Sequence, residues 1–105
     1  MDTKQKIKEK VESNRVMLFM KGNRDFPQCG FSGRAVQILQ ALGAEFETAD
    51  VLMDDEIRQG IKDYSNWPTI PQLYVDGEFV GGSDIMMEMY QNGELKKKLE
   101  GQVSA

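Results

Sequence analysis

Cys29 is the only cysteine in a chain of 105 residues that contains no histidine. Without histidine, neither a Cys-His pair nor a Ser-His-Asp triad can activate a nucleophile, and histidine-ligated zinc or haem is excluded. With one cysteine, neither an intrachain disulfide nor a Cys-x-x-Cys dithiol can form. Any disulfide or metal-thiolate chemistry at Cys29 therefore needs a second sulfur from outside the chain.

The position of Cys29 favours a reactive thiol. It follows the loop 22–28, which holds Pro27, and a helix is expected to begin just after it, near Phe31. The unpaired N–H groups and the positive dipole end of a helix N-terminus stabilise a thiolate, and Lys21 adds a nearby positive charge. The alternative is that Cys29 is a small buried hydrophobe, as many lone cysteines are.

Thr69-Ile70-Pro71 lies between an expected helix and a hairpin, and a proline that opens a strand there is a candidate for a cis peptide bond. The backbone N–H and C=O of Ile70 would then face outward and could pair with a short extended peptide. The alternative is an ordinary trans-proline at a sheet edge.

Gly82-Ser83-Asp84 places small and acidic residues at the start of another expected helix. The N–H groups of its first turn could bind an anion, and the Asp84 carboxylate could hold an ammonium group beside it. Ordinary capping of the helix by Ser83 or Asp84 is the alternative. For Lys21 and Arg58, the alternative to a binding role is a solvated surface charge.

The elements that position these residues are read from hydrophobic periodicity and turn signals. A continuous apolar run at 16–20 indicates a strand buried on both faces, and Asp76-Gly77 indicates a tight hairpin. The expected order is α-β-α-β-α-β-β-α-α, which gives an α/β fold with a four-stranded mixed sheet and helices on both faces. The expected helices are 4–13, 31–42, 55–66, one that begins at 83 or 84, and a short one around 95–99, and the expected strands are 16–20, 46–51, 72–75 and 78–80.

Composition limits the partners and the location. Lys and Arg total 13 against 17 Asp and Glu, a net charge of -4, which argues against nucleic-acid binding. No apolar run approaches the ~20 residues of a membrane span, and we expect no membrane association. One free thiol favours a reducing compartment: the cytoplasm, or an organelle matrix or stroma after removal of a transit peptide. We expect one domain, 1–105, with residues 1–3 and 101–105 frayed.

Four separated motifs together resemble the monothiol glutaredoxins of the Cys-Gly-Phe-Ser class, which have the thioredoxin fold. The motifs are Met-Lys-Gly at 20–22, Cys-Gly-Phe-Ser at 29–32, Trp-Pro-Thr-Ile-Pro-Gln-Leu-Tyr at 67–74 and Gly-Gly-Ser-Asp at 81–84. They occur in the family's order, and the resemblance covers nearly the whole chain.

The resemblance implies a cis-proline at Pro71 and a binding site for glutathione. It assigns the reactive thiol to Cys29, and it places Ile70 against the tripeptide backbone. Lys21 and Arg58 would hold the glycine carboxylate of glutathione, and Ser83 with Asp84 would take its γ-glutamyl end. Many relatives carry cysteine where this chain has Ser83, and a hydroxyl or backbone N–H can also bind a carboxylate.

Two functions of different class follow from the resemblance. The first is an iron-sulfur carrier, a homodimer in which Cys29 of each subunit and two glutathione thiolates bind one [2Fe-2S] cluster. Its partners would be BolA-like proteins and apo iron-sulfur recipients. The alternative is an enzyme that removes glutathione from proteins by monothiol exchange at Cys29. An interaction module with a vestigial site is a third, weaker hypothesis.

Overall fold

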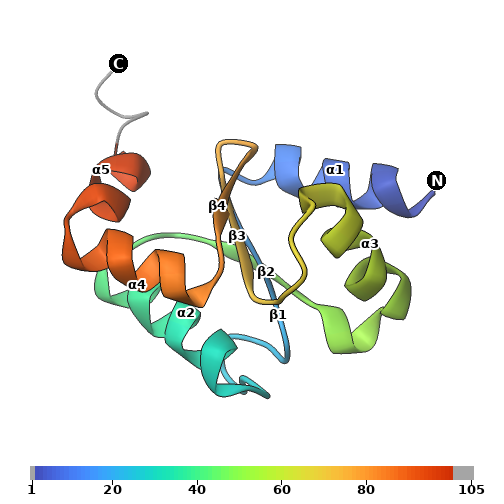
Figure 1. Ribbon diagram of the computed structural model, residues 1–105, viewed down its shortest axis with the longest axis horizontal. Helices are drawn as coiled ribbons and strands as arrows, with labels where there is room; N and C mark the ends of the chain where they lie inside the picture. Colours follow the sequence, from blue (N-terminus) through green and yellow to red (C-terminus); the bar gives the residue numbers. More distant parts are fainter. Residues whose placement is uncertain (1, 101–105) are drawn as a thin grey trace.

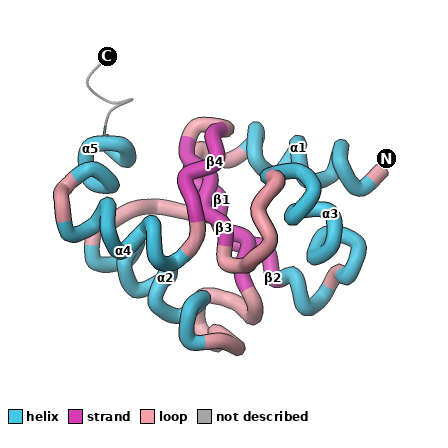
Figure 2. Tube along the Cα trace, in the orientation of Figure 1, coloured by secondary structure: helices cyan, strands magenta, loops and turns pink. Residues whose placement is uncertain are grey.

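The computed structural model describes residues 2–100, which form a four-stranded sheet between two layers of helices (Figures 1 and 2). The elements follow the expected order, with one added 3-10 helix, η1, after the second strand. In chain order they are α1 (Thr3–Ser13), β1 (Val16–Met20), α2 (Gly30–Ala41), β2 (Glu47–Asp50), η1 (Val51–Met53), α3 (Asp55–Ser65), β3 (Gln72–Val75), β4 (Glu78–Gly81), α4 (Ser83–Gln91) and α5 (Glu94–Glu100).

The sheet has the strand order β2-β1-β3-β4. β1 pairs with β2 in parallel and with β3 antiparallel, and β3 pairs antiparallel with β4. All of β1 is buried, as the apolar run 16–20 predicts. Alternation along the strand sends Val16, Leu18 and Met20 to one face of the sheet, and Met17 with Phe19 to the other. The α/β thioredoxin-like fold is therefore confirmed.

The helices divide between the two faces of the sheet. α1 and α3 pack against each other on one face, and α2, α4 and α5 lie on the other, as Figure 1 shows. Each face has its own apolar cluster, one formed around Phe19 and Tyr74, the other around Leu18, Leu39 and Met86. This two-sided core fixes the ends of the sheet, and the functional residues lie at one of those ends.

The hairpin between β3 and β4 turns at Asp76 and Gly77, whose φ angles are 52° and 83°. Positive φ at both positions defines a type I′ turn, so the hairpin prediction is confirmed. β2 is shorter than the expected 46–51. It ends at Asp50 because the Asp50 carboxylate accepts a hydrogen bond from the Leu52 N–H at 2.9 Å, which starts η1.

The start of the chain is capped. The Asp2 carboxylate accepts a hydrogen bond from the Gln5 N–H at 2.8 Å, and the Gln5 side chain accepts one from the Asp2 N–H at 3.1 Å. This capping box places Asp2 and Thr3 in the ordered start of α1. Residues 1 and 101–105, for which fraying is predicted, lie outside the described residues. Between residues 2 and 100, every helix is too short or too polar to cross a membrane.

Candidate functional site

Cys29 is the N-cap of α2. Its backbone is extended, with φ -154° and ψ 146°, and its sulfur accepts a hydrogen bond from the Ser32 N–H at 3.5 Å. Ser32 is fully buried, and its Oγ accepts a hydrogen bond from the Lys21 N–H at 3.0 Å. The end of β1 and the start of α2 are thus joined through Ser32, which fixes the thiol at the helix N-terminus as the sequence predicts.

The pKa of the Cys29 thiol is lowered from its ordinary value. Partial burial pushes the pKa up, but the hydrogen bonds from Ser32, the Phe31 N–H and the positive charge of Lys21 outweigh it. Each of these three groups stabilises the thiolate relative to the neutral thiol. Cys29 is half-buried, so it remains open to an approaching disulfide or metal.

The loop 22–28 that leads to Cys29 is tied down at several points. Gly22 has a φ of 86°, and a Cβ there would lie 2.5 Å from the Phe26 carbonyl, so only glycine fits. The Gly22 N–H donates to the Asp50 carboxylate at 2.9 Å, and the Gln28 N–H donates to the Lys21 carbonyl at 2.9 Å. The approach to the thiol is therefore a folded segment with its own hydrogen bonds.

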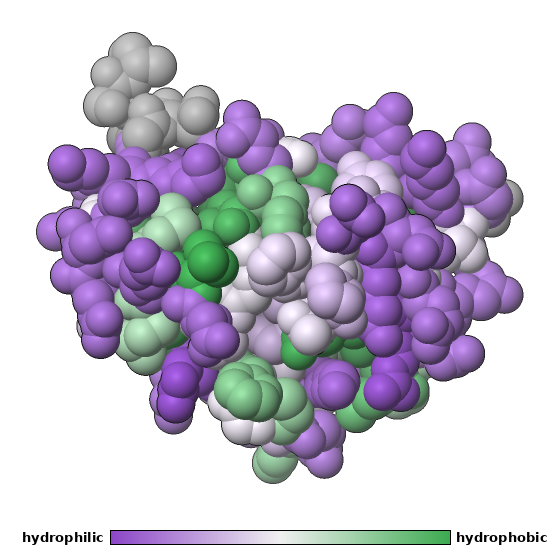
Figure 3. Space-filling model, in the orientation of Figure 1, coloured by the Kyte–Doolittle hydropathy of each residue, from purple (hydrophilic) through white to green (hydrophobic). Residues whose placement is uncertain are grey.

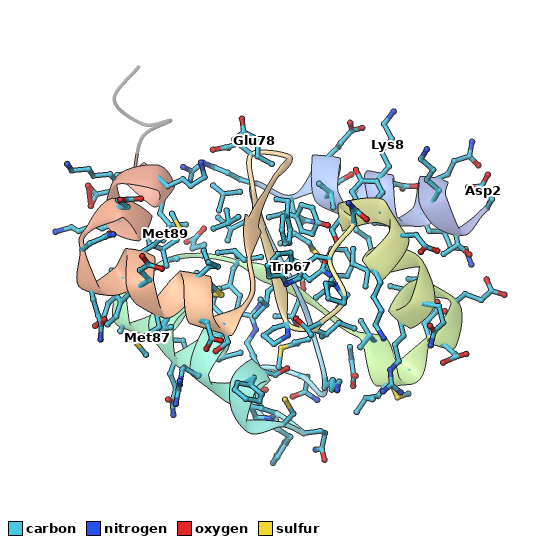
Figure 4. The ribbon with its side chains drawn as sticks, in the orientation of Figure 1. Asp2, Lys8, Trp67, Glu78, Met87 and Met89 are labelled. Atoms are coloured by element: carbon cyan, nitrogen blue, oxygen red, sulfur yellow. The ribbon has the colours of Figure 1, made fainter. Side chains whose placement is uncertain are left out.

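A cleft of about 390 Å³ opens beside this helix start, between α3, the segment 67–71 and α4. Figure 3 shows a pale, near-neutral area in the centre of this face, with hydrophobic surface to its left and below it and hydrophilic surface to its right. Trp67 lies at the centre of this face (Figure 4). The lining residues are Lys21, Phe31, Lys62, Trp67, Pro68, Thr69, Ile70, Pro71, Gly82, Ser83, Asp84 and Ile85.

The Ile70–Pro71 peptide bond is cis, which confirms the expectation for Pro71. Ile70 and Pro71 both line the cleft. Within the described residues, neither the backbone N–H nor the C=O of Ile70 has a hydrogen-bond partner. These two groups are the ones an extended peptide needs for strand-like pairing.

At the opposite wall, Gly82 is the N-cap of α4 and no side chain caps this helix. The hydroxyl of Ser83 is buried and has no hydrogen-bond partner among the described residues. Asp84 is exposed in the first turn. Since neither side chain caps α4, the capping alternative is wrong. A buried hydroxyl at a helix N-terminus that faces a cleft is instead suited to an anionic ligand.

Gly82 allows the two walls of the cleft to approach. A Cβ at Gly82 would lie 3.2 Å from the Pro71 carbonyl oxygen, which belongs to the backbone and cannot move aside like a flexible side chain. The glycine therefore sets the spacing between the cis-proline segment and the start of α4.

The structure brings five of the predicted residues, Lys21, Ile70, Pro71, Ser83 and Asp84, into this one cleft. Cys29 lines a separate hollow of about 560 Å³ with Pro27, Gly30 and Arg34, and it adjoins the cleft through its neighbours Phe31 and Lys21.

Arg58, on α3, is not among the residues that line the cleft; Lys62 is, one helical turn further along. Lys62 was not predicted from the sequence, although its spacing of four residues from Arg58, which puts both side chains on the same face of α3, could have identified it. Trp67 and Phe31 were not predicted as site residues either. Both are exposed in part, at 39% and 59%, although they are large and apolar.

Comparisons with known proteins agree with this geometry. The family model for glutaredoxin matches residues 16–80. An uncharacterized monothiol glutaredoxin of Synechocystis sp. is 68% identical over 99 residues, which are 94% of this chain and 92% of that protein. A chloroplastic monothiol glutaredoxin of Oryza sativa subsp. japonica is 60% identical over 90 residues, 86% of this chain and 54% of the rice chain.

A crystal structure of a buckwheat glutaredoxin–glutathione complex superposes with a TM-score of 0.84 at 26% identity. It covers 94% of this chain and 88% of the buckwheat chain.

Proposed function

Because the chain belongs to the monothiol glutaredoxin family, we propose that it binds glutathione and carries a [2Fe-2S] cluster as a glutathione-ligated homodimer. The observation that carries the proposal is the single thiol, Cys29, held at the start of α2 beside a cleft with charges suited to glutathione. The buckwheat structure of this fold, a glutaredoxin–glutathione complex by its description, supports glutathione as the ligand.

The cleft matches the two charged ends of glutathione. Lys21 and Lys62 offer positive charge to the glycine carboxylate, with Arg58 one turn away on α3. Ser83 and the N–H groups of α4 can receive the γ-glutamyl carboxylate, and Asp84 can hold the adjacent ammonium group. The free N–H and C=O of Ile70 supply backbone pairing between these ends.

The donor set also fits the cluster as cargo. A [2Fe-2S] cluster takes four thiolates, and this chain supplies one, Cys29, whose pKa is lowered toward the thiolate form. Two chains and two glutathione molecules complete the set. Between residues 2 and 100 no group of three or more His, Cys, Asp or Glu side chains is arranged for a metal, so borrowed ligands are what the proposal requires.

The second candidate is glutathione-dependent thiol exchange, which the lowered pKa of Cys29 favours. The Cys29 thiolate attacks the glutathione sulfur of a glutathionylated protein, forms a mixed disulfide and releases the protein thiolate. A free glutathione thiolate then attacks the glutathione sulfur of that mixed disulfide. Oxidised glutathione leaves, and the Cys29 thiolate is restored.

The proposal also covers the proteins that would receive the cluster and the compartment in which this protein works. For cluster transfer we propose BolA-like proteins and apo iron-sulfur proteins as recipients. For location we propose the cytoplasm, with an organelle matrix or stroma as the alternative, which the chloroplastic rice relative supports.

Anaerobic reconstitution with iron, sulfide and glutathione, followed by sedimentation, tests the carrier. The wild type should gain visible absorption and become a dimer only when glutathione is present, and Cys29→Ser should do neither. Asp84→Ala should weaken the dimer, whereas Glu88→Ala, an exposed position on the same helix outside the cleft, should not. A cluster-loaded monomer, or a dimer indifferent to glutathione, contradicts the carrier. Turnover by a cluster-free monomer supports the exchange enzyme.

A further inference from the structure

We propose that Gln72 is the positioning residue of the cleft: its buried side chain holds the segment 67–71 in the shape that receives a glutathione-type ligand. The inference rests on the proposed function, since it concerns the wall against which the ligand backbone would lie. Gln72 itself does not line the cleft. It acts from the core side of the segment.

Gln72 is the first residue of β3, and its side chain has no exposed surface. Its Nε2 donates to the Trp67 carbonyl at 3.2 Å and to the Thr69 carbonyl at 3.1 Å. Its Oε1 accepts a hydrogen bond from the Tyr74 hydroxyl at 3.2 Å. The orientation of the amide is fixed by chemistry, because carbonyl oxygens only accept hydrogen bonds and the amide nitrogen must therefore face them.

Apart from the burial of the Ile70 side chain in the core and the packing of Trp67 against Phe79, the segment is held by few hydrogen bonds. Its start is anchored by the Trp67 N–H, which donates to the Lys62 carbonyl and to the Ser65 Oγ, both at 3.1 Å. From Pro68 to Ile70, the bond from Gln72 to the Thr69 carbonyl is the one hydrogen bond in the described structure. Two prolines in five residues remove the N–H groups that could have formed others.

The same segment presents the groups a ligand would use. All five of its residues line the cleft, and Ile70, next to the Thr69 carbonyl that Gln72 holds, has free backbone N–H and C=O groups. A ligand that pairs with Ile70 benefits when these groups are already in place, because less conformational freedom is lost on binding. Gln72 therefore pre-organises the wall without touching the ligand.

Gln72→Met tests this role, because methionine has a similar length and volume but no donor or acceptor. The matched control is Tyr74→Phe, which removes the hydroxyl bonded to Gln72 Oε1 and leaves both bonds to the segment intact. Two measurements apply to each folded variant: glutathione affinity by calorimetry, and acrylamide quenching of fluorescence from Trp67, the chain's one tryptophan. In the folded protein, quenching reports how accessible Trp67 is and therefore the shape of the segment. A general loss of stability would not change the quenching of the molecules that remain folded.

Glutathione affinity in Gln72→Met should fall about five- to tenfold, which is the change in affinity that corresponds to the net contribution of one hydrogen bond. Quenching of Trp67 should rise and should be partly reversed by saturating glutathione. In Tyr74→Phe, glutathione affinity and Trp67 quenching should both stay near the wild-type values. The inference is overturned if Gln72→Met binds glutathione and is quenched as the wild type is. It is also overturned if Tyr74→Phe changes glutathione affinity and quenching as much as Gln72→Met does.

A wild-type measurement keeps the inference testable if Gln72→Met does not fold. In nuclear magnetic resonance spectra, the side-chain amide protons of Gln72 should exchange with water far more slowly than those of exposed glutamines such as Gln37. Exchange as fast as that of Gln37 overturns the inference. If the wild type does not bind glutathione, the proposed function fails, whereas the quenching comparison still decides whether Gln72 holds the segment.

Discussion

Ser83→Ala should make the free protein more stable and its glutathione complex weaker. The Ser83 hydroxyl is buried, 6% of the residue is exposed, and the oxygen has no hydrogen-bond partner among the described residues. A buried hydroxyl that is left unsatisfied costs roughly 1–3 kcal/mol relative to a paired one. Alanine removes this polar group and leaves only a small gap at the cleft wall.

The two effects have different sizes. We expect Ser83→Ala to raise the free energy of unfolding without ligand by about 0.5–1 kcal/mol, less than the full penalty because the small gap left by alanine loses packing contacts. A hydrogen bond to a charged carboxylate contributes about 1.5–3 kcal/mol, which predicts a loss of glutathione affinity between about tenfold and a hundredfold. Urea unfolding measures the first quantity, and calorimetry measures the second.

Ser32→Ala is the matched control. Ser32 is also a buried serine at a helix start, but its Oγ accepts a hydrogen bond from the Lys21 N–H at 3.0 Å. Alanine at that position leaves the partly buried Lys21 N–H without this partner, so the same chemical change should destabilise the free protein by about 1 kcal/mol or more. If Ser83→Ala destabilises the free protein as Ser32→Ala does and leaves glutathione affinity unchanged, the assignment of the Ser83 hydroxyl to the ligand is refuted.

Two further predictions concern charge. Lys21→Ala and Lys62→Ala should each weaken glutathione binding by ~0.5–2 kcal/mol and Arg58→Ala by less, because Arg58 does not line the cleft; calorimetry that ranks Arg58→Ala first would reverse the assignment. The rate of Cys29 alkylation should reach half its maximum at a lower pH than in the urea-unfolded chain, because the pKa of the thiol is lowered in the folded state, and Ser32→Ala should move that midpoint upward. By linkage, the thiolate adds stability that is fully present above the unfolded pKa and lost as pH falls through the folded pKa, so an opposite slope in urea titrations would contradict the direction of the shift.

Local signals were sufficient for the order of the α-helices and strands and for the position of Cys29. Asp76-Gly77 predicts the I′ turn because both positions need positive φ, and Asp54 predicts the start of α3, where its carboxylate accepts from the Ile57 N–H at 3.2 Å. The thiol at a helix N-terminus also follows from the order of strand, loop and helix around Cys29. In each case a few neighbouring residues determine the outcome.

Features that depend on tertiary contacts were not predictable in this way. η1 begins because the Asp50 carboxylate bonds both the Leu52 N–H and the distant Gly22 N–H, each at 2.9 Å. The choice between Arg58 and Lys62 depends on how α3 is rotated against the cleft. In the sequence Gln72 is one polar residue at the start of an apolar strand, and only the fold shows that its amide turns inward to a loop and a tyrosine.

Two kinds of polar group can be distinguished around the cleft. Some already have hydrogen-bond partners within the protein and hold the cleft in shape, whereas others have none and are available to a ligand. Ser32 and Gln72 are buried with their hydrogen bonds made, and both hold backbone that lines the cleft. The backbone of Ile70 and the hydroxyl of Ser83 face the same cleft without partners in the described residues. Substitution of a positioning residue should therefore lower stability and affinity together. Substitution of the Ser83 hydroxyl should lower affinity while stability rises, because the free protein carries the cost of an unsatisfied group that only a ligand relieves.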